Sequence, residues 1–294
     1  MNWIKRLFAK ESSPSKNSPI SGPKAEAKSA GSRAEIESRF GGLRQPALHL
    51  RPDASSSFSR LGGLPRMPES LEWPTWNGVS QSFLAQIDLA DLQRTLPSCL
   101  PVTGFLYFFY DFEQSAWGFD PKDLGTWRVL YHPGSLTNVR ERSAPSDLPP
   151  EGIYPPKPVC PQRIELLPDL ERLPSRLEWQ SEGQAYDALR REAFDGMTCH
   201  QMLGFPTPIQ NDTMELECQL ASNGVYVGSP EGYRDPRVAD LRSGASEWKL
   251  LLQLDSDNDT GWMWGDVGTI YFWIKESDAS QADFSKVWMI FQCH

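Results

Sequence analysis

The chain has 294 residues, of which 39% are hydrophobic and 11% aromatic, and it contains 11 Trp and 25 Pro. This length allows two ordinary domains or one large duplicated unit with a substantial core, and the many Pro argue against a helical bundle because Pro interrupts helices. The net charge of −9 disfavours nucleic acid as a partner, since an acidic surface repels phosphates.

The first ten residues, Met-Asn-Trp-Ile-Lys-Arg-Leu-Phe-Ala-Lys, would place apolar side chains on one face of a helix and basic ones on another. Such a helix could make weak contact with a membrane surface through residues 1–10. The interpretation that we favour is a frayed terminus or a helix packed on its own body, because ten residues form a marginal helix alone. Ser, Pro, Lys, Ala and Gly then dominate up to residue 33, so residues 1–33 are expected to be a disordered, basic tail and linker.

Strands dominate the elements expected next. A short extended segment is expected over 46–53, and strands over 83–87, 104–110 and 127–131, where apolar and aromatic residues run together. Asp88 begins a short helix to Leu96, because an acidic start precedes apolar residues at helical spacing. Between these, Gly62-Gly63 and Pro65 indicate a shaped loop.

Seven Pro between residues 141 and 161 indicate the boundary between two halves of the chain. Leu177 to Phe194 is the best helix candidate after it. Further strands are expected over 248–254, 269–274 and 287–291.

Three apolar runs recur in the same order in both halves. Gln86 and Gly104 are 18 residues apart, and their counterparts Gln253 and Gly268 are 15 apart. Such self-similarity predicts an internal duplication, with halves at about 45–140 and 195–294. The expected fold class is therefore α+β: a β-rich single globular unit over 34–294, with a few short helices.

Several motifs resemble the YwqG-like family of bacterial proteins, which is built on a domain of unknown function. They are Ser59 to Pro65 with Glu72-Trp73-Pro74, Phe83 to Asp88, His200 to Pro206 with Ile209-Gln210, Leu251 to Asp255 with Gly265 to Gly268, and the segment from Phe284 to Cys293. Together they span roughly residues 45–294. The resemblance implies a single duplicated α+β fold and implies no activity.

Four carboxylates, Asp255, Asp257, Asp259 and Asp266, have a spacing similar to that of a Ca²⁺-binding loop. Thr260 replaces the usual Gly, Asp266 replaces a longer Glu, and the flanks look like strands. We therefore favour an acidic, solvated turn between two strands. No cofactor is expected, with Ca²⁺ at this loop as the alternative.

Gln86 and Gln253 stand inside apolar strands and must find hydrogen-bond partners there. The favoured interpretation is that each ties its strand to the Gly-Pro loop of its own half; the alternative is a polar pair lining a cleft between the halves. His200 is expected to be a hydrogen-bonded loop residue. Zinc binding and Cys catalysis are disfavoured because the five Cys, all expected as free thiols, show no metal-ligand spacing.

No catalytic motif is present, so the expected function is a non-enzymatic interaction or regulatory module, cytoplasmic because its thiols are unpaired. It would present the loops 62–76 and 204–210 to a protein partner. The alternative is a small-ligand or divalent-metal-binding protein that uses the 255–266 loop or the cleft between repeats, and a hydrolase that uses those carboxylates ranks last. The candidate binding residues are Arg60, Gly62, Gly63, Trp73, Gln86, His200, Gln210 and Gln253.

Overall fold

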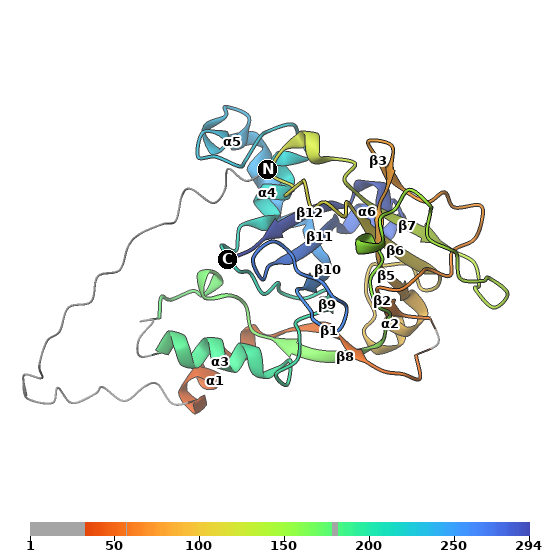
Figure 1. The fold of residues 1–294 in the computed structure, drawn as a ribbon. Coiled ribbons are helices and arrows are strands. Elements are labelled where there is room, and N and C mark those ends of the chain that lie inside the picture. Colours follow the sequence, from red (N-terminus) through yellow and green to blue (C-terminus); the bar gives the residue numbers. More distant parts are fainter. Residues whose placement is uncertain (1–32, 57, 178–181) are drawn as a thin grey trace, which may run out of the picture.

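The computed structural model describes residues 33–56, 58–177 and 182–294, and a ten-stranded sheet forms its centre (Figure 1). Every neighbouring pair of strands in this sheet is antiparallel. In sheet order the strands are β12 (Trp288–Gln292), β11 (Thr269–Lys275), β10 (Trp248–Asp255), β9 (Gln201–Met202), β1 (Gln45–Pro52), β8 (Lys157–Leu166), β2 (Arg60–Leu61), β5 (Ser82–Asp88), β6 (Phe105–Tyr110) and β7 (Trp127–His132). A separate hairpin pairs β3 (Thr75–Trp76) with β4 (Val79–Ser80).

Short helices surround the sheet. They are α1 (Arg33–Phe40), α2 (Leu89–Thr95), α3 (Gln184–Glu192), α4 (Met214–Ala221), α5 (Val238–Leu241) and α6 (Glu276–Ser280), with 3₁₀ turns that include η5 (Leu170–Arg172), η8 (Arg242–Glu247) and η9 (Phe284–Lys286). In Figure 1, α1 and α3 lie side by side, and the rings of Phe40 and Tyr186 meet edge to face at 5.5 Å. Within the described ranges, no helix is long and apolar enough to cross a bilayer. The expectations for residues 1–10 and for a disordered tail lie outside the described residues.

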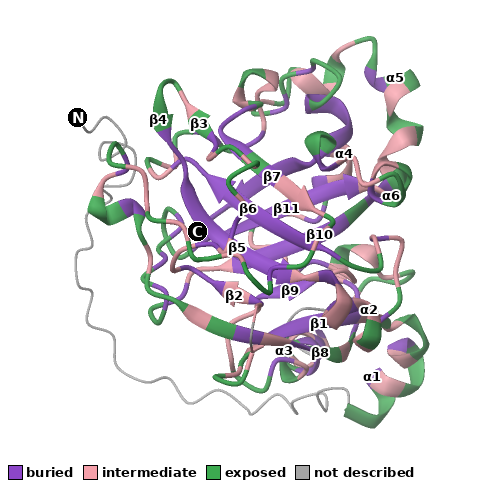
Figure 2. Ribbon diagram, turned by 90° about the vertical axis from the view of Figure 1, so that its right-hand side faces the viewer, coloured by how far each residue is buried: buried purple, intermediate pink, exposed green. Residues whose placement is uncertain are grey.

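The strands expected from the apolar runs are confirmed. All six residues of β6 are buried, as are the first six of β11, and Figure 2 shows the strands as the buried interior of the molecule. Burial on both faces explains why these runs are continuously apolar, where a half-exposed strand would alternate. Asp88 caps α2 by accepting a hydrogen bond from the N–H of Ala90 at 2.9 Å, as its acidic start predicts.

Three expectations require correction. The Pro-rich region 141–161 is not simply a boundary, because β8 begins within it and pairs with β1 from Gln45↔Leu166 to Pro52↔Val159 in the middle of the sheet. The helix expected over 177–194 is α3 (Gln184–Glu192), which ends two residues early, while residues 178–181 near its expected start lie outside the described ranges. Helices α1, α4, α5 and α6 were not expected.

The sheet order has matching ends. Three strands linked in sequence stand at each end (β5, β6, β7 and β10, β11, β12), a two-residue strand follows at each side (β2 and β9), and β1 and β8 meet in the middle. Both β5 and β10 carry a register shift near the start of the paired run, between Phe83 and Ala85 and between Leu250 and Leu252. Consequently Gln86 opposes Tyr107 as Gln253 opposes Tyr271.

The sheet curls so that its two ends pack against each other, almost as in a closed barrel. Phe108 of β6 and Phe272 of β11 meet edge to face at 5.2 Å. Trp127 of β7 donates from Nε1 to the carbonyl of Val287 at 2.9 Å, next to β12. The aromatic residues of both ends therefore share one continuous core, and the outer faces of the two ends are left for other elements to cover.

Candidate ligand-binding site

Left-handed backbone shapes the loops that follow β2 and β9. Gly62 and Gly63 have φ of +60° and +70°, and Leu203 and Gly204 have +62° and +69°. A Cβ on Gly62 would lie 2.2 Å from the carbonyl oxygen of Pro155, so only glycine fits there. Both loops thus begin with two consecutive left-handed residues, and the prediction of a shaped loop at Gly62-Gly63 is confirmed.

Gln86 fixes the first loop. Its side chain, fully buried, accepts from the N–H of Arg66 at 2.8 Å and donates to the carbonyl of Phe58 at 2.9 Å. Tyr107, opposite Gln86, donates from its hydroxyl to the carbonyl of Arg66 at 2.8 Å. Side chains of β5 and β6 therefore supply hydrogen bonds to backbone groups of a loop that has no strand partner to supply them.

Gln253 fixes the second loop in the same manner. It accepts from the N–H of Thr207 at 2.9 Å and donates to the carbonyl of Cys199 at 2.8 Å, while Tyr271 donates to the carbonyl of Thr207 at 2.8 Å. The interpretation that each glutamine holds the nearby Gly-Pro loop is confirmed, because both side chains are buried and both use their amide oxygen and nitrogen in these hydrogen bonds.

His200 has no free ring nitrogen. Its Nε2 lies 3.1 Å from Oδ2 of Asp257 and its Nδ1 accepts from the N–H of Asp255 at 3.1 Å, which fixes the tautomer with the proton on Nε2. Lys157 contacts Asp257 at 2.7 Å and Asp259 at 3.0 Å. Burial acts to raise the pKa of Asp257, but the hydrogen bonds from His200 and Lys157 outweigh it and hold that pKa below its usual range.

The acidic 255–266 loop is a turn between β10 and β11, as favoured above. Asp255 accepts from Thr269 at 2.7 Å, Asp266 is exposed, and Lys157 contacts both Asp257 and Asp259. The turn is not solvated throughout, as was expected, because Asp257 is buried. Among the described residues, no group of three or more His, Cys, Asp or Glu is arranged to hold a metal ion. Ca²⁺ binding stays a prediction, and the ion would have to displace the Lys157 ammonium.

The remaining sequence candidates have structural partners. Arg60 pairs with Glu141 at 2.6 Å, Trp73 donates from Nε1 to the carbonyl of Gln81 at 2.9 Å, and Gln210 donates to the carbonyl of Cys293 at 2.8 Å. Their role in binding stays a prediction. Burial raises the pKa of the Cys199 thiol to about 12, which opposes the thiolate that Cys catalysis requires.

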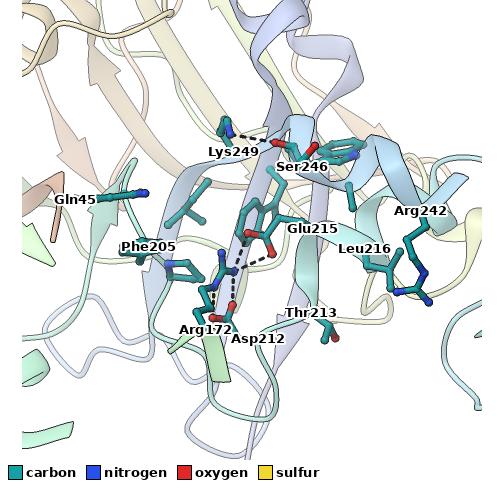
Figure 3. Close-up of a pocket in the computed structure, with 16 residues that line it drawn as sticks. Gln45, Arg172, Phe205, Asp212, Thr213, Glu215, Leu216, Arg242, Ser246 and Lys249 are labelled. Atoms are coloured by element: carbon teal, nitrogen blue, oxygen red, sulfur yellow. Dashed lines mark hydrogen bonds and ion pairs between the residues drawn. The ribbon is translucent and has the colours of Figure 1, made fainter. Parts of the chain in front are cut away.

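A pocket of about 570 Å³ opens beside the 204–206 segment of the second loop. We call it the Arg172 pocket. Its apolar wall consists of Phe205, Pro206, Leu216, Trp248, Leu250 and Trp273, and its charged residues are Arg172, Asp212, Glu215, Arg242 and Lys249. The loop after β9, the 3₁₀ turns η5 and η8, helix α4 and the strands β1, β10 and β11 all contribute residues to it. Figure 3 shows Arg172 between Phe205 on one side and Glu215 and Leu216 on the other. The volume is that of a typical small-molecule site.

Arg172 pairs with two carboxylates in this pocket, Asp212 and Glu215, and the three groups together keep one formal negative charge. The guanidinium donates to both oxygens of Asp212 and contacts Glu215 at 2.7 Å, as the dashed lines in Figure 3 show. Burial raises the pKa of Asp212 and of Glu215 against the opposing effect of Arg172. Burial lowers the pKa of Arg172, but these two partners outweigh it and raise the pKa. Both acids are thus occupied inside the protein.

The groups left without partners in this pocket are hydrogen-bond donors. Nε1 of Trp273, a residue that is 1% exposed, has no partner in the part of the chain that the structure describes. Lys249 bonds the carbonyl of Ser246 at 3.1 Å, and across the described ranges neither Lys249 nor Arg242 forms an ion pair. An orphaned buried donor is costly, so this wall favours a ligand with acceptor atoms.

A second pocket of about 390 Å³ lies on the other side of the same loop, along Thr207, Pro208 and Ile209. Its cations are already paired, Arg190 with Asp169 at 2.8 Å and Arg191 with an aspartate at 2.9 Å. The Arg172 pocket is therefore the stronger candidate.

The Arg172 pocket was not expected from the sequence, although the 204–210 loop that borders it was. Arg172 belongs to a segment without repeat or motif, and Trp248 and Trp273 read as core. The one signal is that Lys249 and Trp273 of β10 and β11 stand at register positions that match those of Ser82 and Phe109 in β5 and β6.

Comparison with known proteins gives a family and no activity. A family model described as a domain of unknown function, DUF1963, matches residues 59–293. No curated protein matches the chain.

Proposed function

The chain belongs to the DUF1963 family, a domain of unknown function, and we propose that it is a non-enzymatic binding protein whose small ligand occupies the Arg172 pocket. The observation that carries the proposal is that Trp273, whose buried Nε1 has no hydrogen-bond partner among the described residues, is one of the residues that line a pocket of about 570 Å³. Natural proteins rarely leave such a donor unpaired, and a ligand acceptor would satisfy it.

The chemistry around the pocket supports binding without catalysis. A general base needs a free nitrogen or carboxylate within reach of its substrate. Both acids of the pocket are held by Arg172, and His200, elsewhere in the fold, uses both ring nitrogens on Asp255 and Asp257. The arrangement therefore orients a ligand and offers no acid–base pair.

A fragment library read by melting temperature tests this proposal, because a ligand that binds only the folded protein raises its apparent stability. Hits should lose their effect in the Leu250→Trp variant, which fills the pocket from its own wall. Val102→Trp is the matched control, since Val102 is 72% exposed and outside the pocket. Hits that survive Leu250→Trp unchanged would place binding elsewhere.

A protein partner, the function first expected from the sequence, is a second proposal. Trp117, Met263 and Val267 are large apolar residues with exposures of 36%, 50% and 53%. A hydrogen bond joins the two loops that carry these residues, because the side chain of Gln114 donates to the carbonyl of Met263 at 3.0 Å. Affinity capture from native lysate with wild type and Met263→Glu tests it; a partner retained equally by both would reject this surface.

The internal duplication predicted from the sequence also belongs here as a proposal. The matched sheet ends, the matched register shifts and the matched glutamine bonds support descent of both halves from one unit. In this view β1 and β8 are counterparts, so the second half begins near residue 157 and the halves are longer than the apolar runs alone indicated.

A further inference from the structure

The two outer faces of the sheet differ in what covers equivalent positions. In the first half, Phe83 of β5 opposes Phe109 of β6. The ring of Trp73 packs edge to face on Phe109 at 5.4 Å, and these three belong to one buried cluster. A tryptophan delivered by the chain itself therefore covers this site.

In the second half, Leu250 of β10 and Trp273 of β11 occupy the same register positions. Both residues line the Arg172 pocket. The pocket therefore lies on β10 and β11 where Trp73 lies on β5 and β6. The size and aromatic character of the group that covers the first site indicate what the second site would accept, because the two underlying faces have the same strand geometry.

The charge of the pocket sets a second requirement. Its two carboxylates are paired with Arg172 and leave one formal negative charge, while two further cations, Lys249 and Arg242, are exposed and give the pocket a formal excess of one positive charge. The position of Lys249 is held by Ser82 in the first half, where the covering group is neutral Trp73. At this register position a cation therefore stands only beside the open site, although Arg142 lies over the ring of Trp73 at 6.0 Å at the covered one.

We propose that the Arg172 pocket binds an aromatic ring system that carries a carboxylate, an inference that rests on the function proposed above. The ring lies against Leu250 and Trp273, as Trp73 lies against Phe109. The carboxylate accepts from Nε1 of Trp273 and faces the ammonium of Lys249, which pairs donors with acceptors and positive with negative charge.

Calorimetric titration of the full chain tests this ligand class. Indole-3-acetate is the probe, and indole and acetate measure the contributions of its ring and of its carboxylate separately. Acetyl-Ala-Trp with a free carboxyl distinguishes a peptide terminus from a free aromatic acid. Indole-3-acetate or acetyl-Ala-Trp should bind at least tenfold more tightly than indole, and acetate alone should give no heat. Lys249→Ala should weaken binding about tenfold, Trp273→Phe should weaken it while the ring contact stays, and Lys122→Ala, an exposed lysine outside the pocket, should change nothing.

Each failure has a distinct meaning. If indole binds as tightly as both acids, or if Lys249→Ala has no effect, the requirement for an anion is wrong. If the fragment library yields ligands sensitive to Leu250→Trp but no aromatic acid among them, the ligand class is wrong and the proposed function stands. If neither the acids nor any library member depends on this pocket, both proposals fail.

Discussion

Replacing Gln253 by Leu should destabilise the fold far more than a surface glutamine would. The substitution keeps the size of the side chain but leaves the N–H of Thr207 and the carbonyl of Cys199 without partners inside the protein. Each buried orphan costs about 1–3 kcal/mol, so the free energy of unfolding should fall by about 2–6 kcal/mol. Gln86→Leu, which orphans the matching groups of Arg66 and Phe58, should cost the same within about 1 kcal/mol.

Urea unfolding followed by tryptophan fluorescence measures this difference directly. Gln281→Leu is the matched control, because exposed Gln281 bonds the carbonyl of Ser277 where water can replace it; its effect should stay within about 0.5 kcal/mol. A Gln253→Leu protein as stable as the Gln281→Leu protein would refute the argument that the glutamine holds the loop, and would show that the loop's own conformation suffices.

Three further predictions concern other parts of the scaffold. Gly62→Ala should destabilise by about 3 kcal/mol or more and Gly78→Ala by about 1 kcal/mol, because both have positive φ but only the first meets neighbouring backbone; equal losses in thermal unfolding would contradict this. His49, whose pKa burial lowers from 6.5 to about 4, is protonated more readily in the unfolded chain, so stability should fall by about 3 kcal/mol between pH 6.5 and pH 4, and a His49→Gln protein with an unchanged pH slope would reject the assignment. Calorimetric titration with Ca²⁺ should give no heat, because Lys157 neutralises Asp257; measurable binding would restore the metal interpretation of that loop.

The apolar runs predicted most of the sheet because burial on both faces leaves little room for polar residues. Strand β8 escaped prediction for the opposite reason. Its sequence, Lys-Pro-Val-Cys-Pro-Gln-Arg-Ile-Glu-Leu, contains two Pro and alternates weakly. It forms because β1 supplies an eight-position partner across 100 residues of chain, which local sequence cannot indicate.

The candidate site was less predictable than the scaffold. Gln86 and Gln253 stood out because a polar residue inside an apolar run needs an explanation, and hydrogen bonds to the loops supply it. The pocket has no such local signal: Arg172 meets Asp212 and Glu215 only after folding. The sequence predicts Trp273 as a core residue and the structure buries it, but its Nε1 has no hydrogen-bond partner among the described residues.

The measurement that tests the Arg172 pocket most directly is a crystallographic fragment screen on the full chain. Bound fragments should collect over Leu250 and Trp273, with an acceptor oxygen about 3 Å from Nε1 of Trp273. A screen in which fragments bind other surfaces while this pocket holds none would contradict the assignment of a ligand site there.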